Sequence, residues 1–319
     1  EHIKNVALKV KVEIDRGNEI AVVLSAMSGE TNRLVGLVNQ MGSLYDAREY
    51  DSVVATGEQV TIGLLALALQ DLGVPARSWL GWQVPFHTDD VHAKARIQKI
   101  DVDELDKRMK TGEVPVVAGF QGIGPDNRIT TLGRGGSDTS AVALAAALDA
   151  DRCDIYTDVD GVYTSDPRIV TKARKLDKIT YEEMLEMASL GAKVLQTRAV
   201  EMAMKYGQRI QVLSSFEDKP GTLVVDEEEI VEKELVSGIA YSRDEAKITL
   251  VRVSDKPGVA AAIFGPLSDA SVNVDMIVQN ESVGGKATDL TFTVTQADLE
   301  RAVKTLEKHS DDIGYEKIH

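Results

Sequence analysis

The sequence predicts a two-domain α/β protein: an αβα sandwich on a mostly parallel sheet, followed by a ferredoxin-like βαββαβ module. Strand-like apolar runs alternate with helical patterns through about residue 226, as in a sandwich of this kind. The composition then turns acidic over residues 225–238. Beyond it a shorter segment follows the order β, α, β, β, α, with the start of a last strand. We therefore expect one domain at 1–226, a linker at 227–246 and a second domain at 247–319.

Runs of apolar residues define the elements of the first domain. Helices are expected at Thr61–Gly73, which ends at a glycine, and at Ala141–Asp149, which is apolar almost all round and should lie inside. The segment GFQGIGPDNRITTLG should be a hairpin that turns at GPDN. Buried strands are expected at Ile20–Ala26, Val114–Phe120, Cys153–Thr157 and Arg209–Ser215. Ligands of such sheets bind beyond the carboxyl ends of the strands.

The second domain repeats the alternation on a smaller scale. Strands are expected at KITLVRV, VNVDMIVQ and TDLTFTV, and helices at VAAAIFGPLSDA and ADLERAVKTLEKH. A last strand begins at GYEKI, which completes the βαββαβ order.

Composition excludes several classes of protein. The 319 residues are 43% hydrophobic and 27% charged, typical of a globular protein, and no apolar run approaches the roughly 20 residues of a membrane span. A net charge of −15 argues against nucleic-acid partners and against an anionic membrane surface. The single cysteine, Cys153, excludes an internal disulfide, suits a reducing cytosol and is expected to be a buried core residue.

The stretch TLGRGGSDTSA, Thr131–Ala141, has three glycines in four residues before a predicted helix. Glycines allow a ligand to approach the backbone closely, and Ser137 and Asp138 stand where free N–H groups and the positive end of the helix dipole face the loop. The residues favour an anion site, with a capped turn that binds nothing as the other interpretation. A serine nucleophile is disfavoured, because the G-x-S-x-G pattern and a nearby histidine are both missing.

Other motifs narrow the choice further. There is no Walker loop and no complete G-x-G-x-x-G. The segment Asp158–Arg168 lacks the ligand pattern of a calcium loop; it is either an acidic turn or a nucleotide site, in which aspartates bind ribose hydroxyls and Arg168 binds phosphate. The spacing of His87 and His92 fits no zinc pattern, so that segment is expected to be a solvated loop.

Six segments in order resemble the aspartate kinases of the amino-acid kinase superfamily: VVLSAMSGETNRL, ATGEQVT, GFQG, TLGRGGSD, TDVDGVYTSDPR and GAKVL. VSDKPG and VNVDMIVQN resemble the regulatory ACT module of the same enzymes. The resemblance implies that ATP, carrying Mg²⁺, phosphorylates the β-carboxylate of L-aspartate in the pathway to lysine, threonine and methionine. It also implies a cytoplasmic enzyme under feedback control, which forms a homo-oligomer or pairs with a shorter regulatory subunit.

The resemblance also assigns residues. Glu58 matches the carboxylate that holds the substrate ammonium, and Arg134 matches the group that binds a substrate carboxylate. Thr31, Phe120 and Ser137 complete that pocket. The catalytic residues implied are Asp138, Arg134 and Lys193. The implied ATP contacts are Ser25, Thr157, Asp158, Tyr163, Arg168 and Lys193. Asp255, Ala260, Asp275 and Gln279 are the implied contacts of a lysine or threonine effector. No protein metal ligand is implied, since Mg²⁺ usually rides on phosphates.

Two departures from the family pattern keep alternatives open. The family begins with a strand and a Lys-Phe-Gly-Gly loop that contacts ATP phosphates, and it carries a second ACT module; this sequence contains neither. If the first loop is absent from the protein, little kinase activity is expected. The alternatives are then a noncatalytic regulatory or ligand-binding protein on the same fold, or another amino-acid kinase such as acetylglutamate or uridylate kinase.

Overall fold

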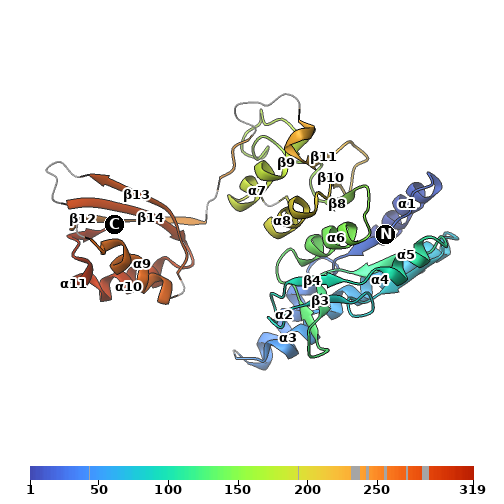
Figure 1. Cartoon of the computed structure of the whole chain (residues 1–319), viewed down its shortest axis with the longest axis horizontal. Coiled ribbons are helices and arrows are strands. Elements are labelled where there is room, and N and C mark those ends of the chain that lie inside the picture. The colour runs from blue at the N-terminus through green and yellow to red at the C-terminus, as the bar shows by residue number, and fades with distance from the viewer. Residues whose placement is uncertain are drawn as a thin grey trace. The chain divides into compact units, whose positions relative to one another are not determined.

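The computed structural model (Figure 1) describes residues 1–42, 44–192, 194–230, 238–241, 244–254, 257–270, 272–281 and 287–319, without the side chains of Asn280, Glu281 and Ala287. The chain divides into two compact units, a first unit at Glu1–Ala240 and a second unit at Tyr241–His319.

One sheet of the first unit is fully parallel, in the order β1 (Val22–Leu24), β5 (Val114–Ala118) and β2 (Ala76–Trp79). Every residue of β5 is buried, as expected for a strand with helices on both faces of its sheet. The expected strands at 20–26 and 114–120 are therefore present, although each is shorter than its apolar run.

Helices cover both faces of this sheet. On one face, α1 (His2–Asp15) and α4 (Thr56–Asp71) share a core with β5 through residues that include Ala7, Leu65 and Val116. On the other, α5 (Asp103–Met109) and α6 (Gly136–Ala147) contribute Leu105 and Leu144 to a core with Val117. The predicted αβα sandwich is confirmed. The two helices predicted from apolar runs, α4 and α6, begin earlier than those runs. Their first turns are mostly polar, so the hydrophobic pattern of the sequence did not include them.

A second sheet of the first unit has the order β8 (Cys153–Thr157), β10 (Ile210–Ser214), β11 (Thr222–Val225) and β9 (Lys178–Thr180). β8 and β10 are parallel, as are β11 and β9, while β10 and β11 are antiparallel. α7 (Tyr181–Ser189) and α8 (Thr197–Tyr206) pack in its core, which contains Cys153. Cys153 is buried, and burial raises the pKa of its thiol to about 12, so it is inert as predicted.

A third sheet has the order β4 (Ile97–Ile100), β3 (Phe86–Thr88), β6 (Gln121–Ile123) and β7 (Ile129–Thr131). β6 and β7 form the predicted hairpin, which turns at residues 124–128. α2 (Glu30–Met41) and α3 (Ala47–Val54) complete the order before α4, and a 3₁₀ turn follows at Glu227–Glu229. β7 leads directly into the glycine-rich loop and α6.

The second unit has the predicted ferredoxin-like order. β12 (Glu245–Ser254), α9 (Val259–Asp269), β13 (Val274–Glu281), β14 (Ala287–Thr295) and α10 (Leu299–Lys308) are followed by a short α11 (Ser310–Ile313) and β15 (Lys317–Ile318). The sheet is antiparallel in the order β13, β14, β12, β15. The helices lie on one of its faces (Figure 1), and α9 and α10 share a core with β14 through residues such as Ile263, Leu306 and Phe292.

One stretch of helix among the described residues, Ala47–Asp71, is long and apolar enough to cross a membrane when judged by length and composition. Half of its apolar window is buried inside the protein, where α4 contacts α1, β2 and β5. That burial is typical of the core helix of a globular domain.

Candidate active site

The carboxyl ends of β1 and β5 meet at one edge of their sheet. Leu24 lies opposite Ala118 in the parallel register, and the backbone N–H of Gly119 donates to the carbonyl of Leu24 at 3.0 Å. The segment after β1, which begins with the exposed Ser25, therefore lies beside the segment after β5, which begins with Gly119. This edge is where a parallel α/β sheet places its ligand.

Glu58 stands at this edge, in the first turn of α4. Its side chain is 2% exposed, and its Oε1 accepts a hydrogen bond from the backbone N–H of Ala26 at 3.1 Å. Its Oε2 is buried and has no hydrogen-bond partner in the described part of the chain. Burial raises the pKa of Glu58 to about 7, while hydrogen bonds from the backbone at Glu58 and Ala26 act in the opposite direction. Burying a carboxylate oxygen without a hydrogen-bond partner costs free energy. A cation or a hydrogen-bond donor that binds Oε2 would therefore stabilise this group.

The start of α4 is fixed against the end of β1. Thr61 donates its hydroxyl to the carbonyl of Ser25 at 2.9 Å. A Cβ at Gly57 would lie 2.8 Å from the Cβ of Ala26, so only glycine allows this close approach. Thr31, at the start of α2, is half-buried.

The loop that enters α6 packs against the residues after β5. Phe120 has a positive φ of 68°, its N–H donates to Ser140 Oγ at 3.1 Å, and its carbonyl accepts from the N–H of Leu132 at 2.9 Å. A Cβ at Gly119 would lie 3.0 Å from Ser137 Oγ. The structure therefore brings Glu58, Phe120 and Ser137 to the same edge of the sheet.

Arg134 and Asp138 flank the start of α6. Arg134 is exposed, between Gly133 and Gly135, both of which have positive φ. Asp138 lies in the first turn of α6, and burial raises the pKa of its carboxyl to about 6, although a hydrogen bond from the backbone of Gln196 lowers it. Two carboxyl groups with raised pKa values, near the ends of β1 and β5 and at the start of α6, make this edge a candidate functional site.

The predicted nucleotide residues form a second group, around the end of β8. Thr157 ends β8 and donates its hydroxyl to Asp158 at 3.1 Å. Tyr163 donates its hydroxyl to Asp160 at 3.0 Å. Arg168 is 88% exposed at its side chain and pairs with Asp166 at 2.8 Å, so its guanidinium already has a carboxylate partner.

Lys193 and Asp255, a predicted catalytic residue and a predicted effector residue, lie outside the described residues. The other effector candidates are Ala260 on α9 and Asp275 and Gln279 on β13, all exposed. Asp275 Oδ1 accepts from the N–H of Met276 at 2.8 Å, and the Gln279 amide donates to Thr288 Oγ1 at 3.3 Å.

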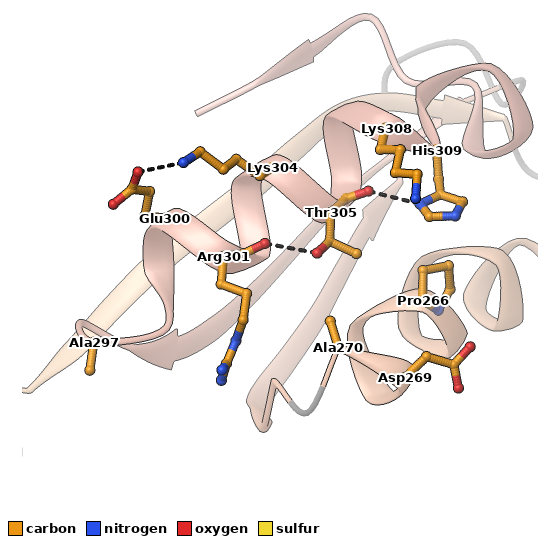
Figure 2. Close-up of a pocket in the computed structure, with 10 residues that line it drawn as sticks. All are labelled: Pro266, Asp269, Ala270, Ala297, Glu300, Arg301, Lys304, Thr305, Lys308 and His309. Carbon is orange, nitrogen blue, oxygen red and sulfur yellow. Dashed lines mark hydrogen bonds and ion pairs between the residues drawn. The ribbon is translucent and has the colours of Figure 1, made fainter. Parts of the chain in front are cut away.

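A hollow of about 780 Å³ in the second unit lies between the end of α9 and α10 (Figure 2). It includes three basic residues of α10, Arg301, Lys304 and Lys308, but Lys304 pairs with Glu300 at 2.7 Å and Arg301 with Asp298 at 2.5 Å. Of the expected effector residues that the structure describes, none lines this hollow.

The expectation of a solvated loop around His87 and His92 is wrong for both residues, because His87 lies in strand β3 and the side chain of His92 is buried. The side chain of His92 is 8% exposed, and its Nδ1 lies 2.6 Å from Oδ2 of the fully buried Asp51. The polar segment at residues 87–92 did not predict this pair, because Asp51 lies 41 residues before His92 in the sequence. Within the described ranges, no three His, Cys, Asp or Glu side chains converge as a metal centre requires.

Comparison with known proteins gives consistent matches. The model of the amino acid kinase family matches residues 1–214, and an ACT domain model matches residues 239–309. Aspartate kinase Ask_LysC of Stutzerimonas stutzeri is 58% identical over 315 residues, which are 98% of this chain and 76% of that protein. The chain thus spans about three quarters of that relative.

Comparison with solved structures also finds aspartate kinases. The aspartate kinase from Synechocystis is 41% identical, with a TM-score of 0.64 over 99% of this chain and 55% of that one. E. coli aspartokinase III in complex with aspartate and ADP is 27% identical, with a TM-score of 0.70 over 97% of this chain and 67% of that one. The same enzyme in complex with lysine and aspartate has a TM-score of 0.68 at 27% identity over the same shares.

Proposed function

The chain belongs to the amino acid kinase family and, within it, to the aspartate kinases, and we propose that it transfers the γ-phosphoryl group of ATP to the β-carboxylate of L-aspartate. The observation that carries the proposal is the buried Glu58 carboxylate, whose Oε2 has no partner in the described chain, at the edge of the sheet beside the loop of Arg134. A substrate with both an ammonium and a carboxylate complements these two groups. E. coli aspartokinase III, a relative, has been solved with aspartate and ADP.

In this proposal the substrate ammonium binds Glu58 and one substrate carboxylate binds Arg134. A cation beside Oε2 offsets the cost of burying that carboxylate and returns its pKa toward the ordinary range. Arg134 is exposed and carries a planar fork of N–H donors that matches a carboxylate. Thr31, Phe120 and Ser137 enclose the remaining surface of the substrate.

The reaction needs positioning and positive charge more than it needs a base. The acceptor carboxylate has an ordinary pKa of about 3.9, so it is already an ionised nucleophile at neutral pH. One of its oxygens attacks the γ-phosphorus in line with the departing ADP oxygen, and no proton must be removed. The N–H groups at the start of α6, with the positive end of its dipole, favour the charge that develops on the phosphoryl oxygens.

The remaining roles concern ATP. Ser25, after β1, and Lys193 are proposed as contacts of the phosphates, and Thr157, Asp158, Tyr163 and Arg168 as contacts of the nucleotide. Arg168 then has to exchange or share its bond with Asp166. Asp138 is proposed to organise the centre of phosphoryl transfer. Mg²⁺ carried on the ATP phosphates would neutralise part of their charge.

The second unit is proposed to bind an effector amino acid. The exposed carboxylate of Asp275 suits an ammonium, and Ala260 and Gln279, with Asp255, complete the set that we propose. Lysine is the first candidate, because aspartokinase III of E. coli has been solved with lysine bound; threonine is the second. Binding is proposed to couple to catalysis in an oligomer, formed by identical chains or with a shorter regulatory subunit.

The test is ADP release by the full-length protein with ATP, Mg²⁺ and one acceptor at a time. L-Aspartate should support turnover, while L-glutamate, N-acetylglutamate and UMP should not. Turnover with one of those three alone would replace aspartate by another acceptor, and the lack of turnover with all four would favour a noncatalytic protein. Adding lysine or threonine to the active reaction then identifies the effector.

A further inference from the structure

A buried carboxylate outside the site holds the base of the Arg134 loop. Asp51, on α3, is fully buried, and its two oxygens accept from the Thr131 hydroxyl at 2.5 Å and from the Ala93 N–H at 3.0 and 3.1 Å. His92 Nδ1 lies 2.6 Å from Oδ2. Thr131 is the last residue of β7, so Asp51 joins three segments: α3, residues 92–93 and the start of the glycine-rich loop.

A half-buried cation, the guanidinium of Arg198, holds the same segments from another element. Arg198, on α8, donates to the carbonyl of Leu132 at 2.5 Å and to that of Ala95 at 2.9 Å. Burial, followed by the neighbouring Arg96, lowers the pKa of the Arg198 guanidinium, as expected for a charge withdrawn from water. The N–H of Ala95 also donates to the carbonyl of Thr131 at 2.9 Å. Residues 131–132 are thus tied to residues 92–95 by a carboxylate, a guanidinium and a backbone bond.

Gly133 and Arg134 connect residues 131–132 to the proposed substrate site. Gly133 has a φ of 76°, and a Cβ there would lie 3.0 Å from the carbonyl oxygen of Ala93. Arg134 follows directly, so a shift of residues 92–95 or of Thr131 moves the backbone that carries its guanidinium. Buried ionic groups add little net stability compared with apolar packing, but they fix a geometry.

We propose that Asp51 and Arg198 are positioning residues for Arg134, and that through the bonds to Thr131, Leu132, Ala93 and Ala95 they set the affinity for the substrate carboxylate. The proposal rests on the role given to Arg134 in the proposed function. A misplacement of about 1 Å at a reacting centre can cost on the order of a hundredfold. Loss of one buried bond at the base of the loop should have a smaller effect of the same kind.

Thr131→Val tests this with little change in volume, and the chain offers a matched control. Thr130, the preceding residue, is equally buried, and its hydroxyl pairs with that of Thr88 at 2.7 Å and has no bond to Asp51. Thr130→Val therefore removes a comparable buried hydrogen bond from the same strand. Thr131→Ser keeps the hydroxyl that Asp51 binds. All three are less disruptive than removing the buried charge of Asp51 itself.

Two readouts are compared across these variants and the unsubstituted full-length protein. Thr131→Val should raise the KM for L-aspartate roughly tenfold with the KM for ATP nearly unchanged, whereas Thr130→Val and Thr131→Ser should leave both close to the parent values. Amide hydrogen exchange is independent of turnover. The N–H groups of Leu132 and Gly136, which bond to Phe120 and Gly133, should exchange about tenfold faster only in Thr131→Val.

The outcomes are distinct. Equal KM changes for both substrates, or the same exchange in Thr130→Val and Thr131→Val, would overturn the positioning role and leave only structural stabilisation. Faster exchange in Thr131→Val alone, without any aspartate-dependent turnover in the parent protein, would support the loop anchor and reject its link to substrate affinity, because the proposed function itself would then have failed.

Discussion

Replacing Glu58 by glutamine should stabilise the first unit at pH 8 while it removes the affinity for L-aspartate. The two effects have one cause. The buried carboxylate is kept with an unpartnered Oε2, which costs stability in the free protein and becomes useful when a cation binds. Glutamine keeps an oxygen that can accept from the N–H of Ala26 and carries no charge.

The size of the effect follows from the raised pKa of Glu58, which moves from 4.5 to about 7 because of burial. Between those values the folded protein holds a proton that the unfolded chain has released, so stability falls as pH rises through this window. The shift corresponds to at most roughly 3 kcal/mol at pH 8. Asp138, whose pKa is also raised, titrates in both proteins, so its contribution cancels in the comparison.

The assay is thermal unfolding of both proteins at pH 5 and pH 8, followed by tryptophan fluorescence. Both tryptophans, Trp79 and Trp82, lie in the first unit, so the signal reports that unit alone. The variant and the parent should unfold at similar temperatures at pH 5. At pH 8 the variant should unfold higher by roughly 5–10 °C, since about 1 kcal/mol corresponds to roughly 2–4 °C for a unit of this size.

Aspartate provides the second half of the test. It should raise the unfolding temperature of the parent protein and leave that of Glu58→Gln unchanged. A variant that gains no stability between pH 5 and pH 8 relative to the parent would refute the raised pKa of Glu58, and equal stabilisation of both proteins by aspartate would refute its role in binding the substrate.

Two further substitutions separate the roles in the glycine-rich loop. Arg134→Ala should raise the KM for L-aspartate by roughly 10- to 100-fold, the range for a hydrogen bond to a charged group, with the KM for ATP nearly unchanged; equal losses for both substrates would contradict its role. Gly135→Ala places a Cβ 2.1 Å from Gln196 Cγ, and the φ of 72° at this position strains an alanine. Because the backbone of Gln196 donates a hydrogen bond to Asp138, its displacement should disturb Asp138, and kcat should fall at least about tenfold. Gly207→Ala is the control, because its φ of 63° imposes similar backbone strain with nothing within 4 Å; a similar kcat for both variants would exclude the contact as the cause.

The sequence predicted the layers of the fold and the edge of the site because both depend on local patterns. β5 is apolar at every position, and the glycines of the loop stand directly before α6, so their neighbours in space follow from their order in the chain. The short strands β3 and β4 were not predicted, since three or four residues do not establish a period of two. Helix α1 was not predicted either; only Ala7 and Val10 of its residues are buried.

Contacts between distant residues were beyond the reach of sequence patterns. Glu58 was assigned through its motif. The sequence could not show that its Oε1 accepts a hydrogen bond from Ala26, 32 residues earlier, or that packing buries its Oε2 without a partner among the described residues. The buried pair of Asp51 and His92 was missed for the same reason, because each residue stands in a polar segment typical of a surface. The roles assigned by resemblance to Arg168 and Asp275 stay predictions.

The most direct test of the central claim is hydroxylamine trapping of the acyl phosphate, with the position of the new bond identified. The full-length protein is incubated with ATP, Mg²⁺, hydroxylamine and L-aspartate, and the product is compared with authentic α- and β-hydroxamates of aspartate by mass spectrometry. The β-hydroxamate, formed only when both ATP and the protein are present, is the result that we predict. Formation of the α-hydroxamate, or of none while ATP is consumed, would contradict the proposed transfer of the phosphoryl group to the β-carboxylate.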